Sequence, residues 1–141
     1  MHNPNARIVA LDVGDKRIGV ASANVVARLA TPLATLQVSD DPVRQIQDLV
    51  AEQTAAALVL GLPRNLQGED TQQTLKVRHF GERLQHHLNI PIYWQDEALT
   101  SRLSEERLKS TNKPYQKSDI DALAATQILE DFLAAQEVLA L

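Results

Sequence analysis

The chain has 141 residues, of which 44% are hydrophobic, and a formal net charge of −4 at pH 7. This length suits one domain with a substantial core, and the absence of cysteine excludes disulfides and thiolate metal sites. The N-terminus lacks the basic-then-apolar order of a secretory signal, and no apolar run approaches the ~20 residues of a membrane span. We therefore expect one soluble, cytoplasmic domain over residues 1–141, with flexible ends.

The first half of the chain predicts a meander of strands followed by a helix. Arg7 to Val13 is rich in β-branched and aliphatic residues and ends at a Gly-Asp turn. Lys16 to Ala21 is again strand-like and completes a hairpin, and a third short strand is expected from Leu33 to Val38. The segment from Ser39 to Pro42 is typical of a helix start, because it combines capping residues with a proline.

The second half alternates strands and helices. Ala57 to Leu60 is an all-apolar run bounded by breakers, which indicates a central strand buried on both faces. We expect a long helix from Thr71 to Leu88 and a strand from Ile90 to Gln95. A helix from Ser101 to Lys109 and a final amphipathic helix from Ser118 to Leu141 follow. The residues expected to face inward from the first of these helices are Leu75, Phe80, Leu84 and Leu88.

This order of elements predicts an α/β fold. Three meander strands followed by two crossover strands form a mixed five-stranded sheet flanked by helices. Ligand sites in such sheets lie outside the carboxyl ends of the strands. Carboxylates at strand ends are therefore candidate site residues.

Three acidic residues occupy such positions. Asp12 lies near the end of the first strand, on the face that it shares with Ile8 and Ala10 by alternation. A carboxylate in so apolar a strand is costly unless it is paired, hydrogen-bonded or metal-bound. Glu97 follows the last predicted strand, and Asp121 lies on the apolar stripe of the final helix. All three can converge on one end of the sheet.

Each acid also has a simpler structural explanation. Asp12 would accept hydrogen bonds from the hairpin turn. The pair Asp96-Glu97 would stabilise a helix N-terminus through the helix dipole. Asp121 would form a capping box with Ser118. These explanations remain open at the level of sequence.

The chemistry of the three acids favours a hard cation. A ligand set made only of oxygen suits Mg²⁺ or Mn²⁺ rather than zinc. The net negative charge argues against nucleic acid, because phosphate contacts require a basic surface. However, the segment from Arg102 to Lys117 holds five basic and two acidic residues, either as a phosphate-binding surface or as a solvated helix face.

Four ordered motifs resemble the signatures of the YqgF (RuvX) family. They are LDVGDKRIGVA at residues 11–21, VLGLPRNLQG at 59–68, DEALT at 96–100 and KSDIDALAA at 117–125. The resemblance covers nearly the whole chain. These bacterial proteins are ribonuclease H-like, are related in fold to Holliday-junction resolvases and are assigned to pre-16S rRNA processing. The resemblance implies one ribonuclease H-like nuclease domain.

The resemblance also implies roles for individual residues. Asp12, Glu97 and Asp121 would be the catalytic carboxylates that hold Mg²⁺ or Mn²⁺ for two-metal phosphodiester hydrolysis. Two positions depart from the family pattern, since Ala98 replaces a usual arginine and Asp119 a frequent basic residue. The candidate phosphate-contacting residues are Lys16, Arg17, Arg64, Asn65, Arg102 and Lys117.

The implied substrate is the 5′ end of pre-16S rRNA, free or within a ribosomal precursor particle. Monomer and homodimer both remain open, and no membrane partner is expected. Three other functions also remain open: resolution of four-way DNA junctions, a non-catalytic RNA- or ribosome-binding module, and nucleotide binding. The last arises because Asp12-Val13-Gly14 resembles the first phosphate loop of actin-like ATPases. Those enzymes enclose their nucleotide between two lobes, and 141 residues supply one.

Overall fold

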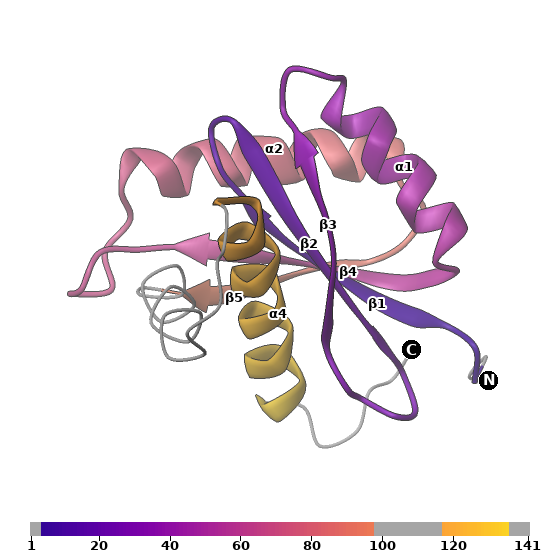
Figure 1. The fold of residues 1–141 in the computed structure, drawn as a ribbon. Helices are drawn as coiled ribbons and strands as arrows, with labels where there is room; N and C mark the ends of the chain where they lie inside the picture. Colours follow the sequence, from indigo (N-terminus) through magenta and orange to yellow (C-terminus); the bar gives the residue numbers. More distant parts are fainter. Residues whose placement is uncertain (1–3, 98–116, 136–141) are drawn as a thin grey trace.

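The computed structural model of the chain describes residues 4–97 and 117–135, and Figure 1 shows their arrangement. The strands are β1 (Arg7–Val13), β2 (Arg17–Asn24), β3 (Thr31–Gln37), β4 (Ala55–Pro63) and β5 (Ile92–Glu97). The helices are α1 (Pro42–Glu52), α2 (Gln72–His87) and α4 (Lys117–Ala135). The predicted order of elements in these ranges is confirmed.

The five strands form one mixed sheet in the order β3-β2-β1-β4-β5. The pairs β1–β2 and β2–β3 are antiparallel, whereas β1–β4 and β4–β5 are parallel. The β1–β2 hairpin is closed by its own backbone, where the amide of Gly14 donates to the carbonyl of Arg17 at 2.9 Å. Because β1, β4 and β5 run parallel to one another, their carboxyl ends lie at the same edge of the sheet.

The two faces of the sheet carry separate apolar cores, as alternation along β1 predicts. Val9 and Leu11 belong to a core covered by α1 and α2. Ile8 and Ala10 point to the opposite face and pack with Ile128 of α4. Of the helices that the structure describes, α4 is the one that crosses this second face (Figure 1). The candidate carboxylate Asp12 shares the face of Ile8 and Ala10.

The strands β4 and β5 extend further than the apolar pattern indicates. β4 runs over 55–63 rather than 57–60, because it pairs along its length with β1 on one side and β5 on the other. β5 runs over 92–97 rather than 90–95, and Glu97 pairs with Pro63. Glu97 is therefore part of the strand instead of following it.

One predicted core residue of α2 was wrong. Leu75 is 52% exposed, whereas Val77 is fully buried. The buried stripe of α2 follows Val77, Phe80 and Leu84, and a residue two positions before Val77 points about 200° away around the helix. The predictions for Phe80 and Leu84 are confirmed, and Leu88 is partly buried just beyond the helix.

Two other predictions concern the C-terminal part of the chain. The helix expected from Ser101 to Lys109 lies outside the described residues. The final helix begins at Lys117, and its backbone is described as far as Ala135. Within residues 4–97 and 117–135, no helix is both long and apolar enough to cross a membrane.

Candidate active site

Asp12 and Asp121 come together because a glycine lets the helix α4 approach the strand β2 closely. Asp12 pairs across the hairpin with Gly19 of β2. A Cβ atom on Gly19 would lie well inside van der Waals contact of the Asp121 carbonyl oxygen. The backbone of α4 therefore rests directly on β2, which only glycine permits. This contact places Asp121 beside Asp12.

Burial and a neighbouring like charge act together on Asp12. Desolvation, followed by the charge of Asp121, raises the pKa of Asp12 from 3.8 to about 6. Within the described residues, no hydrogen bond runs from the hairpin turn to its carboxylate, so the turn does not explain an acid at this position. A divalent cation would relieve the repulsion between the carboxylates of Asp12 and Asp121, and hard cations prefer oxygen ligands. These residues fit a metal ion.

Arg17 neutralises part of this charge. Its Nε donates to Asp121 Oδ2 at 2.6 Å, and the two side chains are 30% and 20% exposed. We predicted Arg17 as a phosphate contact, and in this structure its partner is the carboxylate of Asp121. The capping-box explanation of Asp121 is not supported, because α4 already includes Lys117 and Ser118 lies inside the helix.

Glu97 lies on the same face of the sheet but at a distance from the other two acids. Tyr93 of β5 contacts Phe132 of α4 with ring centroids 5.5 Å apart, and Glu97 follows four residues later on that side. However, β4 separates β5 from β1, so the two strands are ~10 Å apart. Among the described residues, no three Asp, Glu or His side chains are close enough to hold one metal ion.

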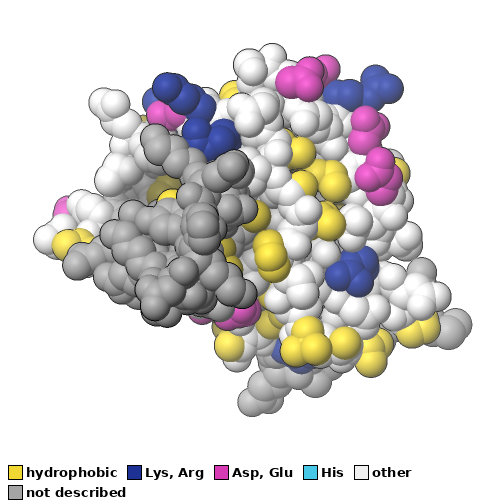
Figure 2. All heavy atoms as spheres, in the orientation of Figure 1, with side chains coloured by type: hydrophobic (Ala, Val, Ile, Leu, Met, Phe, Trp, Pro, Cys, Tyr) yellow, Lys and Arg dark blue, Asp and Glu magenta, His cyan; other side chains and the backbone are white. Residues whose placement is uncertain are grey.

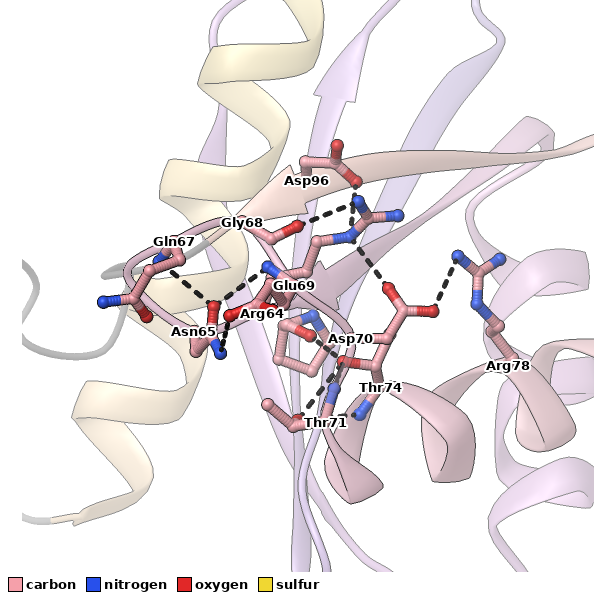
Figure 3. Close-up of polar contacts among 11 residues, drawn as sticks. Arg64, Asn65, Gln67, Gly68, Glu69, Asp70, Thr71, Thr74, Arg78 and Asp96 are labelled. Atoms are coloured by element: carbon pink, nitrogen blue, oxygen red, sulfur yellow. Dashed lines mark hydrogen bonds and ion pairs between the residues drawn. The ribbon is translucent and has the colours of Figure 1, made fainter.

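The predicted phosphate contacts Arg64 and Asn65 shape a loop, which we call the β4–α2 loop and which comprises residues 64–71. Arg64 Nε lies 3.4 Å from Asp70 Oδ1 and 3.6 Å from Asp96 Oδ1, and Figure 3 draws both ion pairs. Asn65 Oδ1 accepts hydrogen bonds from two backbone amides of the same loop. In this structure both side chains are engaged in holding the loop.

The remaining predicted contacts are placed only in part. Lys16 is exposed in the β1–β2 hairpin, and Figure 2 shows Lys and Arg side chains gathered around the tip of that hairpin. Arg102 and Ala98 lie outside the described residues. Of Lys117 and Asp119, only the helical backbone is described.

Sequence reasoning did not identify two glycines as parts of the site. Gly19 allows the close approach of α4, and a Cβ on Gly61 of β4 would collide with the side chain of Ile128. A signal for both was available, because an isolated glycine within a strand often marks a close backbone approach. Both glycines stand within runs of strand-forming residues.

The Arg17–Asp121 ion pair leads to a prediction about stability. We expect Arg17→Met to lower the free energy of unfolding of the metal-free protein by about 1–3 kcal/mol at pH 7, because Asp121 would lose its partner beside a second acid. Arg44→Met is the matched control, since the Arg44–Asp48 pair is largely exposed. Urea unfolding of the three proteins measures the difference. Equal losses in both variants would contradict the structural role of Arg17.

The chain is similar to known proteins over most of its length. The family model RuvX, described as Holliday junction resolvase, matches residues 6–135. A relative from Chloroflexus aggregans is 41% identical over 133 residues, covering 92% of this chain and 94% of its own length. A relative from Crocosphaera subtropica is 43% identical over 129 residues, covering 89% and 90%. Both carry the name "Putative pre-16S rRNA nuclease".

The fold has a clear counterpart among solved structures. The structure of T. thermophilus RuvC in complex with Holliday junction substrate superposes with a TM-score of 0.60, over 92% of this chain and 94% of that one. The two sequences are 12% identical, so the likeness concerns the fold alone. The predicted ribonuclease H-like fold is confirmed.

Proposed function

The chain belongs to the RuvX family, and from this premise we propose that it is a metal-dependent nuclease that cuts pre-16S rRNA. The observation that carries this proposal is the placement of Asp121 beside Asp12 near the carboxyl end of β1, the edge where α/β sheets bind ligands. A nuclease of this kind is a hydrolase that needs no covalent intermediate on the protein.

The carboxylates would hold Mg²⁺ or Mn²⁺. Asp12 and Asp121 supply oxygen ligands from a strand and from a helix, and Glu97 would complete the set from β5. The bound metal would supply an activated water and neutralise charge on the phosphate. Arg17 stands at the same face and would turn to the phosphate as the cation takes over its place at Asp121. Lys16 at the hairpin tip would add a further phosphate contact.

A cleavage assay tests this proposal. The purified protein is incubated with end-labelled pre-16S leader RNA and with a four-way DNA junction, in Mg²⁺, Mn²⁺ or EDTA. We expect cutting of the RNA in either metal and none in EDTA. We expect Asp121→Asn to slow cutting at least ~100-fold, because a metal ligand is lost. Asp131→Asn is the matched control, since this acid lies on the same helix and is bonded to Gln127.

The assay also separates the other functions. If only the four-way junction is cut, the substrate is DNA and not RNA, in line with the description of the family model. Binding of RNA without metal-dependent cutting would indicate a non-catalytic module. Glu97→Gln, measured in the same way, tests the third ligand. Activity equal to that of the unaltered protein would remove Glu97 from the set.

A further inference from the structure

A large apolar side chain is exposed in the loop that follows β4. Leu66 belongs to the β4–α2 loop and is 70% exposed. In Figure 2, hydrophobic atoms lie at the tip of this loop, which forms the leftmost projection of the molecule. A single exposed leucine is common on protein surfaces. Its importance here depends on how firmly the loop is held and on where it projects.

The tip of the loop is a closed turn built around Asn65. The Asn65 amide donates to the Glu69 carbonyl at 3.1 Å, and the Gly68 amide donates to the Asn65 carbonyl at 2.9 Å. Asn65 Oδ1 also accepts from the amides of Gln67 and Glu69 at 3.0 and 2.9 Å, as Figure 3 shows. Gly68 has a φ of 77°, a conformation that glycine adopts without strain.

The base of the loop is tied to two other elements. Arg64 lies between Asp70 of the loop and Asp96 of β5, and it also donates to the Gly68 carbonyl at 3.3 Å. Asp70 in turn contacts Arg78 of α2 at 3.7 Å. Figure 3 shows Asp70 and Asp96 pointing toward Arg64, and Arg78 pointing toward Asp70. The loop is therefore preorganised, which lowers the entropy lost when it binds a partner.

The loop projects from the catalytic edge of the sheet. It follows Pro63, which pairs with Glu97 at the end of β5. In Figure 1 it extends beyond the arrowheads of β4 and β5. Asp12 lies near the carboxyl end of β1, on the face of the sheet that α4 crosses. A nucleic-acid strand whose phosphate reaches Asp12 therefore runs along the edge from which the loop projects. An apolar side chain at this edge is in position to enter between the bases of that strand.

We propose that the β4–α2 loop is a wedge whose Leu66 inserts between two adjacent bases of the nucleic acid next to the bond that is cut. This inference rests on the proposed function, because it assigns the bound partner to the same edge of the sheet. Leucine is among the side chains that open base steps in this way, and the unstacking bends the strand toward the protein. Leu66 is a positioning residue, and Arg64 and Asn65 hold it in place.

The wedge is tested by fluorescence, independently of cleavage. A series of leader RNAs carries a single 2-aminopurine at successive positions, and each is bound by Asp121→Asn protein. We expect a several-fold rise in fluorescence at one base step, since this base brightens when it is unstacked. Adding Leu66→Ala removes the rise, and Leu66→Met retains it. Leu29→Ala is the matched control, because Leu29 is 73% exposed in the turn between β2 and β3.

Kinetics of the otherwise unaltered protein supply the second measurement. We expect Leu66→Ala to lower kcat on structured leader RNA roughly 10- to 100-fold, the range seen when a stacking contact with a base is removed. Cutting of an unstructured oligonucleotide should not change, because its bases are already unstacked. Leu29→Ala should match the unaltered protein on both substrates.

The outcomes distinguish the wedge from the nuclease. Metal-dependent cutting that is equal in Leu66→Ala and Leu29→Ala would overturn the wedge and leave the nuclease standing. A Leu66-dependent rise in fluorescence without any cutting would support the wedge and remove the nuclease. The absence of any rise with the Asp121→Asn protein would overturn the wedge directly.

Discussion

Asp12→Asn is expected to lower metal-dependent cleavage on the order of 10³-fold and, at the same time, to stabilise the metal-free protein at neutral pH. The loss of activity follows because a metal contributes several kcal/mol of transition-state stabilisation and asparagine is a poor ligand for it. The gain in stability follows because asparagine has a similar shape but no charge to bury beside Asp121.

The sign of the pH dependence follows from the raised pKa. An unfolded Asp12 titrates near 3.8 and the folded one near 6, so between these values the folded protein binds the proton more tightly. Stability is therefore lost as pH rises through this window, by about 3 kcal/mol in total. Asp12→Asn escapes this loss. Its advantage over the unaltered protein should be near zero at pH 4 and largest at pH 7.

Urea unfolding in EDTA at pH 4, 5, 6 and 7 measures this advantage. Asp15→Asn is the matched control, because Asp15 lies exposed in the same hairpin, with Lys76 3.3 Å away. Added Mg²⁺ should stabilise the unaltered protein and have little effect on Asp12→Asn. An advantage that does not change with pH would show that burial does not perturb Asp12. Full cleavage by the variant would remove Asp12 from the ligand set.

Gly19→Ala is expected to destabilise the protein by about 3 kcal/mol or more, the upper end of the cost of overpacking. The added Cβ would meet the backbone of Asp121 and Ala122, which cannot rotate away. The helix α4 must then lift from β2. Cleavage should fall together with stability, because Asp121 moves away from Asp12.

Gly61→Ala provides the comparison for Gly19→Ala. Its Cβ would meet Cδ1 of Ile128, a side-chain atom. The double variant Gly61→Ala/Ile128→Val removes the nearer of the two clashing Ile128 atoms and should recover part of the lost stability, with Ile128→Val alone as reference. Circular dichroism melts and the cleavage assay follow both series. A larger loss of stability and activity from Gly61→Ala than from Gly19→Ala would contradict the close contact between α4 and β2.

The sequence predicts the framework of the fold because the framework is local. Alternation along β1 correctly assigns Ile8 and Ala10 to one face and Val9 and Leu11 to the other. The true length of β4 depends on pairing with two distant strands, which no local pattern contains. Leu75 was misassigned on its apolar character alone, because it lies about 200° around α2 from Val77 and so away from the buried stripe.

The candidate site is less accessible to such reasoning. The sequence identifies Asp12 and Asp121 as unusual acids. Their placement side by side depends on the close approach of α4 to β2 at Gly19, and that glycine was overlooked. Arg17 and Asp121 are 104 positions apart, so no spacing rule links them. Arginine and asparagine can hold a loop as well as a phosphate. The contacts of Arg64 and Asn65 show that both hold the β4–α2 loop, and their contact with phosphate stays a prediction.

The placement of Asp121 beside Asp12 also determines when, during synthesis and folding, the candidate site is completed. Asp12 and Asp121 are far apart in the sequence. Bringing them together is therefore a late and slow event in folding, because the long stretch of chain between them must be ordered first. During synthesis, the strands β1 to β5 emerge well before α4. A growing chain that has not yet released α4 holds Asp12 without its partner. On the proposed function, a growing chain would therefore gain nuclease activity only after α4 has packed onto the sheet.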